Sequence, residues 1–158
     1  MMRALTLHQP WAWAVVHADK GVENRPVAPP EALIGDDFAV HAGLVVDEAA
    51  HADFRAGRYG DAARAVPDLD KLVRGAVIGV ARLDDYVRGP FFPDKPRPGR
   101  DFSSDARWFA GPVGNLLSNR RAIASPIPCR GMQGWWPVPA PVEAAVREQL
   151  AREEHRHG

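Results

Sequence analysis

One stretch decides the fold. It runs from Leu5 to Arg25 and reads Leu-Thr-Leu-His-Gln-Pro-Trp-Ala-Trp-Ala-Val-Val-His-Ala-Asp-Lys-Gly-Val-Glu-Asn-Arg. Alternating apolar residues over 3–7 predict a short strand that ends at the polar pair before Pro10. Proline is favoured at the first position of a helix, because that position needs no backbone N–H. The apolar run over 11–18 is therefore expected to form a helix directly after the strand.

The end of this stretch gathers charged groups. Gly21 is expected to end the helix in the left-handed conformation, and residues 22–25 are expected to be extended. Glu23 and Arg25 are two residues apart, so they point to the same side of an extended segment. Together with Lys20 they are expected to line one cleft. The alternative is purely structural, with a Glu23–Arg25 salt bridge and Lys20 as a cation at the helix end.

The composition is typical of a single globular domain. The chain has 158 residues, a formal net charge of +0 and 46% hydrophobic residues. Its one cysteine, Cys129, excludes a disulfide framework and fits a reducing cytoplasm. No run of 18 apolar residues and no signal-peptide pattern occurs, so we expect a soluble cytoplasmic protein without a membrane partner. Residues 1–141 are predicted to form one domain, and residues 142–158 a C-terminal helix with a frayed tail.

Further along the chain, short elements alternate with turns. Asp47 is expected to cap a helix that ends near Arg55. Residues 88–112 are expected to form a long loop, of the kind that often serves function. Asp84 and Asp85 are expected to mark a strand end or a bulge. The remaining predicted strands cover residues 38–43, 75–83, 115–123, 126–128 and 135–138. This pattern predicts an α+β fold, a small β-barrel with helices packed against it.

Charge is unevenly distributed along the chain. Residues 1–70 carry 6 basic and 11 acidic side chains, whereas residues 71–142 carry 11 basic and 5 acidic ones. The second half would then present a positive surface that suits nucleic acid. The other interpretation is that its cations are scattered and solvated. The residues concerned are Arg88, Lys95, Arg97, Arg100, Arg107, Arg120, Arg121 and Arg130.

Several motifs resemble those of one protein family. Gln9-Pro10-Trp11-Ala12, then Lys20, then Glu23-Asn24-Arg25, is similar to the opening signature of the ASCH (activating signal cointegrator homology) domains. The segments 38–43, 75–81, 119–128 and 131–135 look like later motifs of the family, so the resemblance spans roughly residues 2–139. ASCH domains belong to the PUA-like superfamily of small β-barrels. The resemblance therefore implies a barrel with a ligand cleft.

The resemblance also implies binding of RNA or a modified nucleoside. Gln9 and Asn24 would read a base edge through their amide groups, and Trp11 would form an aromatic wall. Arg25 or Arg130 would hold phosphate or ribose. Lys20 and Glu23 would line the same cleft.

Three later residues are further candidates for ligand binding. His41 lies in one of the strands that match the family. Gln133 belongs to Gly131-Met-Gln-Gly134, which either reaches into the cleft or is a plain turn. Trp135 and Trp136 point to opposite faces of a strand. Trp135 is therefore either a platform for base stacking or a cover for the C-terminal helix.

The alternative function is a hydrolase, either a ribonuclease or an amidohydrolase of N4-acylated cytidines. In family members with the amidohydrolase activity, the lysine that matches Lys20 is catalytic, and a threonine stands where this chain has Glu23. With that departure, Glu23 would activate water while Lys20 polarises the carbonyl and protonates the leaving amine. Asp84 and Asp85 are the candidates for a second carboxylate. A third interpretation is a protein-interaction module.

We expect neither a metal nor any other cofactor. No carboxylate or histidine stands at ligand spacing beside His8 or His41. The sequence contains no Walker-type glycine loop and no Gly-x-Ser-x-Gly motif. The oligomeric state is not predicted.

Overall fold

The computed structural model describes residues 1–93, 99–100 and 102–158. Its strands are β1 (Arg3–Gln9), β2 (Val22–Arg25), β3 (Asp37–Val46), β4 (Ala76–Arg88), β5 (Val113–Pro128) and β6 (Trp135–Pro137). Its α-helices are α1 (Trp11–His17), α2 (Glu48–Arg55), α3 (Asp61–Arg64) and α4 (Ala140–His157). Short 3₁₀ helices form at η1 (Glu31–Leu33), η2 (Leu69–Lys71) and η3 (Ala106–Trp108).

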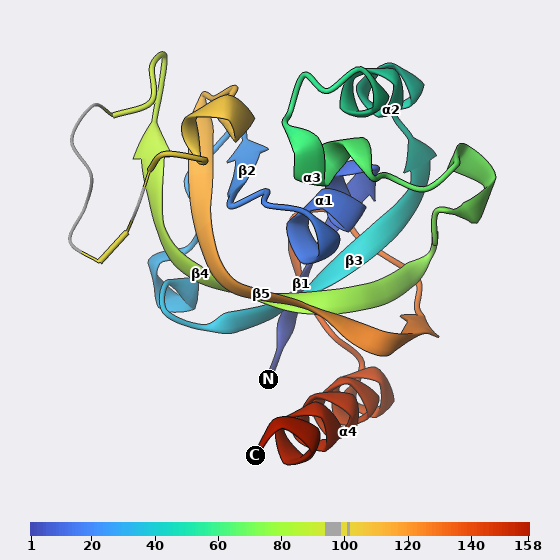
Figure 1. The fold of residues 1–158 in the computed structure, drawn as a ribbon. Helices are drawn as coiled ribbons and strands as arrows, with labels where there is room; N and C mark the ends of the chain where they lie inside the picture. The colour runs from blue at the N-terminus through green and yellow to red at the C-terminus, as the bar shows by residue number, and fades with distance from the viewer. Residues whose placement is uncertain (94–98, 101) are drawn as a thin grey trace.

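The strands form one mixed sheet in the order β2-β5-β4-β3-β1-β6. The β1–β3 pair is parallel and the other pairs are antiparallel. The long strands β4 and β5 curve strongly across the molecule (Figure 1). Within the described residues β2 and β6 remain at the two edges, so the sheet is not closed. The α+β class is confirmed, whereas the predicted barrel is not.

Helices cover both faces of this sheet (Figure 1). Leu5, Val40 and Ile78 belong to the core cluster that packs with α1. Their strand neighbours Ala4 and Ala39, which point to the other face, belong to the cluster that packs with α4. A third cluster is aromatic and joins α1, α2 and η3. The apolar character of the central strands thus follows from their burial on both faces.

The opening stretch folds as a strand, a helix and a second strand, with two local differences from the prediction. Pro10 stands before the first helical residue, and the Gln9 side chain accepts a hydrogen bond from the Trp13 N–H. The helix ends with Ala18 in an extended conformation, so Gly21 is not its left-handed cap. Glycine fits there for another reason. A Cβ at residue 21 would lie 2.7 Å from Asp105 Oδ1.

Two predicted strands are longer than their sequence patterns suggest. Asp84 and Asp85 do not end β4 but lie at a register shift, which is the bulge alternative. Residues 115–123 and 126–128 are parts of the single strand β5. Register shifts against β4 let one strand follow the curve of the sheet where a regular ladder would break.

The C-terminal helix is also longer than predicted. It begins at Ala140 and continues through His157, so residues 155–157 are helical and not frayed. Val146 is fully buried against the sheet. Ion pairs one helical turn apart, Arg147 with Glu143 and Arg152 with Glu148, add support along the exposed side. Among the described residues no helix is long and apolar enough to span a membrane.

Candidate functional site

A pocket of about 620 Å³ opens beside the end of β2. We call it the Arg25 pocket. Its walls come from β1, from the segment after β2, and from the loop before β6 and the start of that strand. Of the predicted site residues it brings together Arg25, Gln133 and Trp135. The other lining residues are Leu5, Thr6, His8, Pro26, Val27, Ala28, Pro30, Met132 and Gly134.

Arg25 is held in place from the protein side. Its Nη2 donates to the Thr6 carbonyl oxygen at 3.0 Å. Its Nε lies 3.7 Å from Glu23 Oε1, and the side chain is 26% exposed. The guanidinium therefore lines the pocket in a fixed orientation and presents a positive charge to it.

Behind Arg25 lies a buried ion pair. Lys20 is 1% exposed and Glu23 is 9% exposed. Lys20 Nζ donates to Glu23 Oε2 and to the Val22 carbonyl oxygen, each at 2.6 Å. Lys20, Glu23 and Arg25 thus form one chain of contacts, but of the three only Arg25 lines a described pocket. Lys20 is therefore an interior residue, and its ammonium group is satisfied by these two hydrogen bonds.

Asn115 is a buried polar residue that the sequence reasoning missed. It lies on β5 directly across from Glu23 and is 0% exposed. Neither its amide nitrogen nor its amide oxygen has a hydrogen-bond partner among the described residues. Cross-strand partners share one face of the sheet, so the amide belongs to the same polar group as Glu23. The sequence does not show that Asn115 lies beside Glu23, because the register between β2 and β5 brings the two residues together.

A second pocket of about 640 Å³ adjoins the first. We call it the Arg130 pocket. It contains the predicted residues His41, Arg130 and Gln133. The two pockets share Thr6, Met132 and Gln133 as walls. Its other lining residues are Gly43, Leu44, Gly75, Cys129 and Gly131.

Thr6 and His41 contact each other in the wall of the Arg130 pocket, and Thr6 also lines the Arg25 pocket. Trp136 Nε1 donates to Thr6 Oγ1 at 3.0 Å, and Thr6 Oγ1 lies 3.2 Å from His41 Nδ1. His41 Nε2 lies 2.6 Å from the Cys129 carbonyl oxygen. A carbonyl only accepts, so Nε2 carries the proton, and the Thr6 hydroxyl donates to Nδ1 of the neutral ring. Burial lowers the pKa of His41, against a smaller opposing effect of the Cys129 bond.

Acidification is expected to weaken the fold through His41. The lowered pKa means that the unfolded chain takes up this proton more readily than the folded one. The contribution of His41 to the free energy of unfolding is therefore fully present above the unfolded pKa of about 6.5, and it is lost as the pH falls below that value. Urea unfolding at pH 7.5 and pH 5.5 measures this loss, which His41→Gln should reduce. His155→Gln, an exposed control on α4, should leave it unchanged, and equal losses in all three proteins would contradict the assignment.

Gln9 and Asn24 are not in the Arg25 pocket. Gln9 is buried, and its amide donates to the Val73 carbonyl oxygen while accepting from the Trp13 N–H. Asn24 donates to the Trp108 carbonyl oxygen and accepts from the N–H groups of residues 110 and 111. Both amides therefore hold distant segments of the chain together and are not placed to read a base edge.

Trp11 lies in the aromatic cluster of the core. Its ring packs edge-on against Phe54, Tyr59 and Trp108. Its Nε1 donates to Asp47 Oδ2, the carboxylate that also caps α2. The Trp11 ring is thus used for packing, and it does not line the Arg25 pocket.

Most arginines of the second half serve the fold. Arg100 bridges Asp84 and Asp105. Arg107 and Arg121 pair with acidic residues of the first half. Arg120 donates to two carbonyl oxygens at the end of α1, and Arg88 lies over the Tyr86 ring. Lys95 and Arg97 lie outside the described residues. The predicted positive surface is therefore partly neutralised in the part of the chain described, and Arg130 is exposed.

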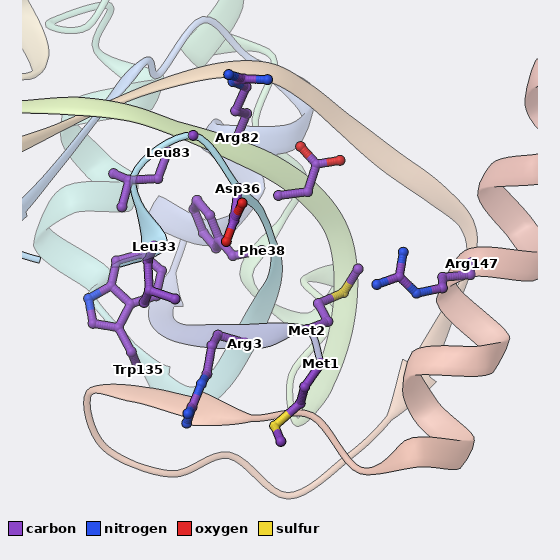
Figure 2. Close-up of a pocket in the computed structure, with 12 residues that line it drawn as sticks. Met1, Met2, Arg3, Leu33, Asp36, Phe38, Arg82, Leu83, Trp135 and Arg147 are labelled. Atoms are coloured by element: carbon purple, nitrogen blue, oxygen red, sulfur yellow. The ribbon is translucent and has the colours of Figure 1, made fainter. Parts of the chain in front are cut away.

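A third pocket, of about 430 Å³, lies on the far side of Trp135 (Figure 2). Arg3, Arg82 and Arg147 approach it from different elements, together with Asp36. Arg82 pairs with Asp84, and Arg147 pairs with Glu143. Two of its three arginines are thus balanced by carboxylates. No group of three or more potential metal ligands occurs among residues 1–93, 99–100 and 102–158.

Comparison with known proteins relates this architecture to solved structures. No family model and no curated protein matches the sequence. The ASCH protein of Zymomonas mobilis is 16% identical with a TM-score of 0.53, over 93% of this chain and 94% of that chain. A serine-to-alanine mutant of that protein is 17% identical with a TM-score of 0.50, and the match covers 93% of this chain and 94% of the mutant chain. A tyrosine-to-phenylalanine mutant is 16% identical with a TM-score of 0.51, and the match covers 93% of this chain and 96% of the mutant chain. The chain therefore has the ASCH fold that its opening motif predicted.

Proposed function

We propose that the protein binds single-stranded RNA or a modified nucleoside, with a base in the Arg25 pocket. The observation that carries this proposal is the meeting of three different groups in one pocket. A guanidinium, a side-chain amide and an indole, from Arg25, Gln133 and Trp135, line the same concave space. These are the groups with which proteins hold unstacked bases.

Each group has a distinct role in this proposal. The partly exposed Trp135 ring offers an apolar face for stacking, and its position is fixed by edge-on packing against Phe38 at 5.0 Å. Gln133 supplies both a donor and an acceptor for a base edge. Arg25 supplies donors and a positive charge for a carbonyl or a phosphate. A pocket of about 620 Å³ falls in the usual range for small-ligand sites.

Replacement of Arg25 tests the proposal. Arg25→Ala is expected to weaken binding of a single-stranded RNA oligomer by about 1–3 kcal/mol, because one specific arginine contact is lost. Fluorescence anisotropy at low salt measures the affinity. Arg152→Ala removes the same charge from the exposed face of α4 and should bind like wild type. Equal affinities of Arg25→Ala and wild type, or no binding by wild type at low salt, would refute the proposal.

The hydrolase alternative has less support from the geometry. Both candidate catalytic groups, Lys20 and Glu23, are buried and bonded to each other. An amide bond in the Arg25 pocket would meet Arg25 before it met Lys20. Asp84 is engaged by Arg100 and by the Ser118 hydroxyl. We therefore propose a binding function, in which the buried pair positions Arg25.

A further inference from the structure

We propose that the ligand is a polynucleotide and not a free nucleoside, with consecutive bases in the Arg25 pocket and the Arg130 pocket. This inference rests on the proposed function of the Arg25 pocket. It adds a second base site and thereby assigns the substrate class. Three observations support it: the two pockets share a wall, the second pocket has groups that suit a nucleotide, and the pocket beyond Trp135 does not.

The two pockets are neighbours with a common wall. Thr6, Met132 and Gln133 line both of them, so the pockets lie on either side of these three residues. Thr6 also fixes both sides, because its carbonyl oxygen holds Arg25 and its hydroxyl holds His41. Each pocket alone is large enough for one base. A single nucleoside would leave one of them empty.

The loop of residues 131–134, which lines both pockets, packs closely against Thr6 and His41. A Cβ at Gly131 would lie 2.7 Å from His41 Cε1 and 2.8 Å from Thr6 Oγ1. Real Cβ atoms do not approach neighbours so closely, so glycine lets the loop backbone pack directly on the two side chains. Backbone packing at Gly131 thus holds this loop in place, and flexible side chains are not the only part of the wall.

The Arg130 pocket has the chemistry of a tolerant base site. Leu44 is 75% exposed and Met132 is 60% exposed, so both present apolar surface to solvent. A methionine thioether is polarizable and packs against aromatic rings of varied shape. Arg130 is exposed and forms no ion pair with the described residues. Its guanidinium is therefore free for the phosphate that links two nucleotides.

The pocket beyond Trp135 lacks this chemistry. Asp36 and Asp37 line it, and carboxylates repel phosphate. Arg82 and Arg147, which Figure 2 shows around this pocket, already pair with Asp84 and Glu143. The ligand path is therefore expected to run from Trp135 toward Arg130 and not toward Arg82.

Comparison of ligands of one and two nucleotides tests the inference. Isothermal calorimetry is used with a nucleoside 5′-monophosphate and the dinucleotide of the same base, for each of the four RNA bases. For at least one base, the dinucleotide is expected to bind about tenfold or more tightly, the gain from stacking one further base. Arg130→Ala and Leu44→Glu should remove most of this gain and leave the affinity for the monophosphate unchanged. Arg25→Ala should weaken both ligands.

The outcomes separate this inference from the proposed function. Equal affinities for the monophosphate and the dinucleotide would overturn the second site while leaving the Arg25 pocket in place. The same holds if Arg130→Ala weakens both ligands equally. Failure of both ligands and of longer RNA to bind wild type would overturn the proposed function, and this inference with it. Arg152→Ala serves as the charge-matched control throughout.

Discussion

Lys20→Met is expected to destabilise the fold by about 3–5 kcal/mol, because removing one partner of a buried ion pair leaves the other charge uncompensated. Glu23 would keep only the more distant Arg25, whose Nε lies 3.7 Å from Oε1. The Val22 carbonyl oxygen would lose its donor as well. Urea unfolding at pH 7 measures the change. Lys71→Met, at an exposed lysine, is the control and should change stability by less than about 0.5 kcal/mol.

A double replacement shows whether the loss comes from the pair. Lys20→Met combined with Glu23→Leu removes both charges, so it should recover a large part of the stability lost in Lys20→Met alone. If Lys20→Met unfolds at the same urea concentration as wild type, Lys20 is not the buried partner described here. That result would return it to the ligand cleft and favour the hydrolase interpretation.

Arg100→Ala is expected to cost a similar amount, about 3–5 kcal/mol, because a part-buried carboxylate network loses its cation. The Arg100 side chain is 15% exposed. Its Nε donates to Asp105 Oδ2 at 2.9 Å and its Nη1 to Asp84 Oδ2 at 3.1 Å. It also donates to the carbonyl oxygens of Gly21 and Leu117. One side chain thus fastens the loop after β4 to β5 and to the turn before β2.

Arginine is required there by geometry as well as charge. Arg100→Lys keeps the charge but replaces a planar fork with a single ammonium, so it should recover only part of the stability lost in Arg100→Ala. Arg74→Ala, at an exposed arginine before β4, is the control. Unfolding midpoints of Arg100→Lys equal to those of wild type would show that the fork geometry is unimportant. Midpoints of Arg100→Ala within error of wild type would contradict the network itself.

The local elements of the opening stretch could be predicted because their signals are local. Apolar alternation gives β1, the run after Pro10 gives α1, and the Asp47 cap gives the start of α2, where its side chain accepts from the Ala50 N–H. That the sheet stays open, where a closed barrel was predicted, could not be seen in this way. It depends on whether β2 and β6 meet, and no short-range pattern encodes a contact between strands so far apart in the chain.

The candidate site stays a prediction, and the structure brings only part of its residue set together. Arg25, Gln133 and Trp135, which were predicted to bind a ligand, line one pocket. Gln9 and Asn24 looked equally suitable for ligand binding, because the sequence shows that an amide can donate and accept hydrogen bonds but not which groups it contacts. Their partners lie 64 and 84 positions along the chain, where the sequence gives no sign of them. Tertiary partners decide whether a polar side chain is available.

Composition misled in a related way. A surplus of arginine in residues 71–142 suggested a positive surface. In the described structure several of these arginines instead pair with the acidic first half or with backbone carbonyls. The two opposite charge surpluses thus partly neutralise each other within the fold. The cations that would meet the proposed ligand are Arg25 and Arg130, which line the two pockets.

Nuclear magnetic resonance of the tryptophan indoles tests the central claim most directly. The chain has five tryptophans, and their Nε1–H signals can be assigned through single replacements such as Trp135→Phe. Titration with a single-stranded RNA oligomer at low salt should shift the Trp135 signal and leave that of Trp108, buried in the aromatic core, unmoved. An unmoved Trp135 signal, with shifts confined to other tryptophans, would contradict base binding in the Arg25 pocket.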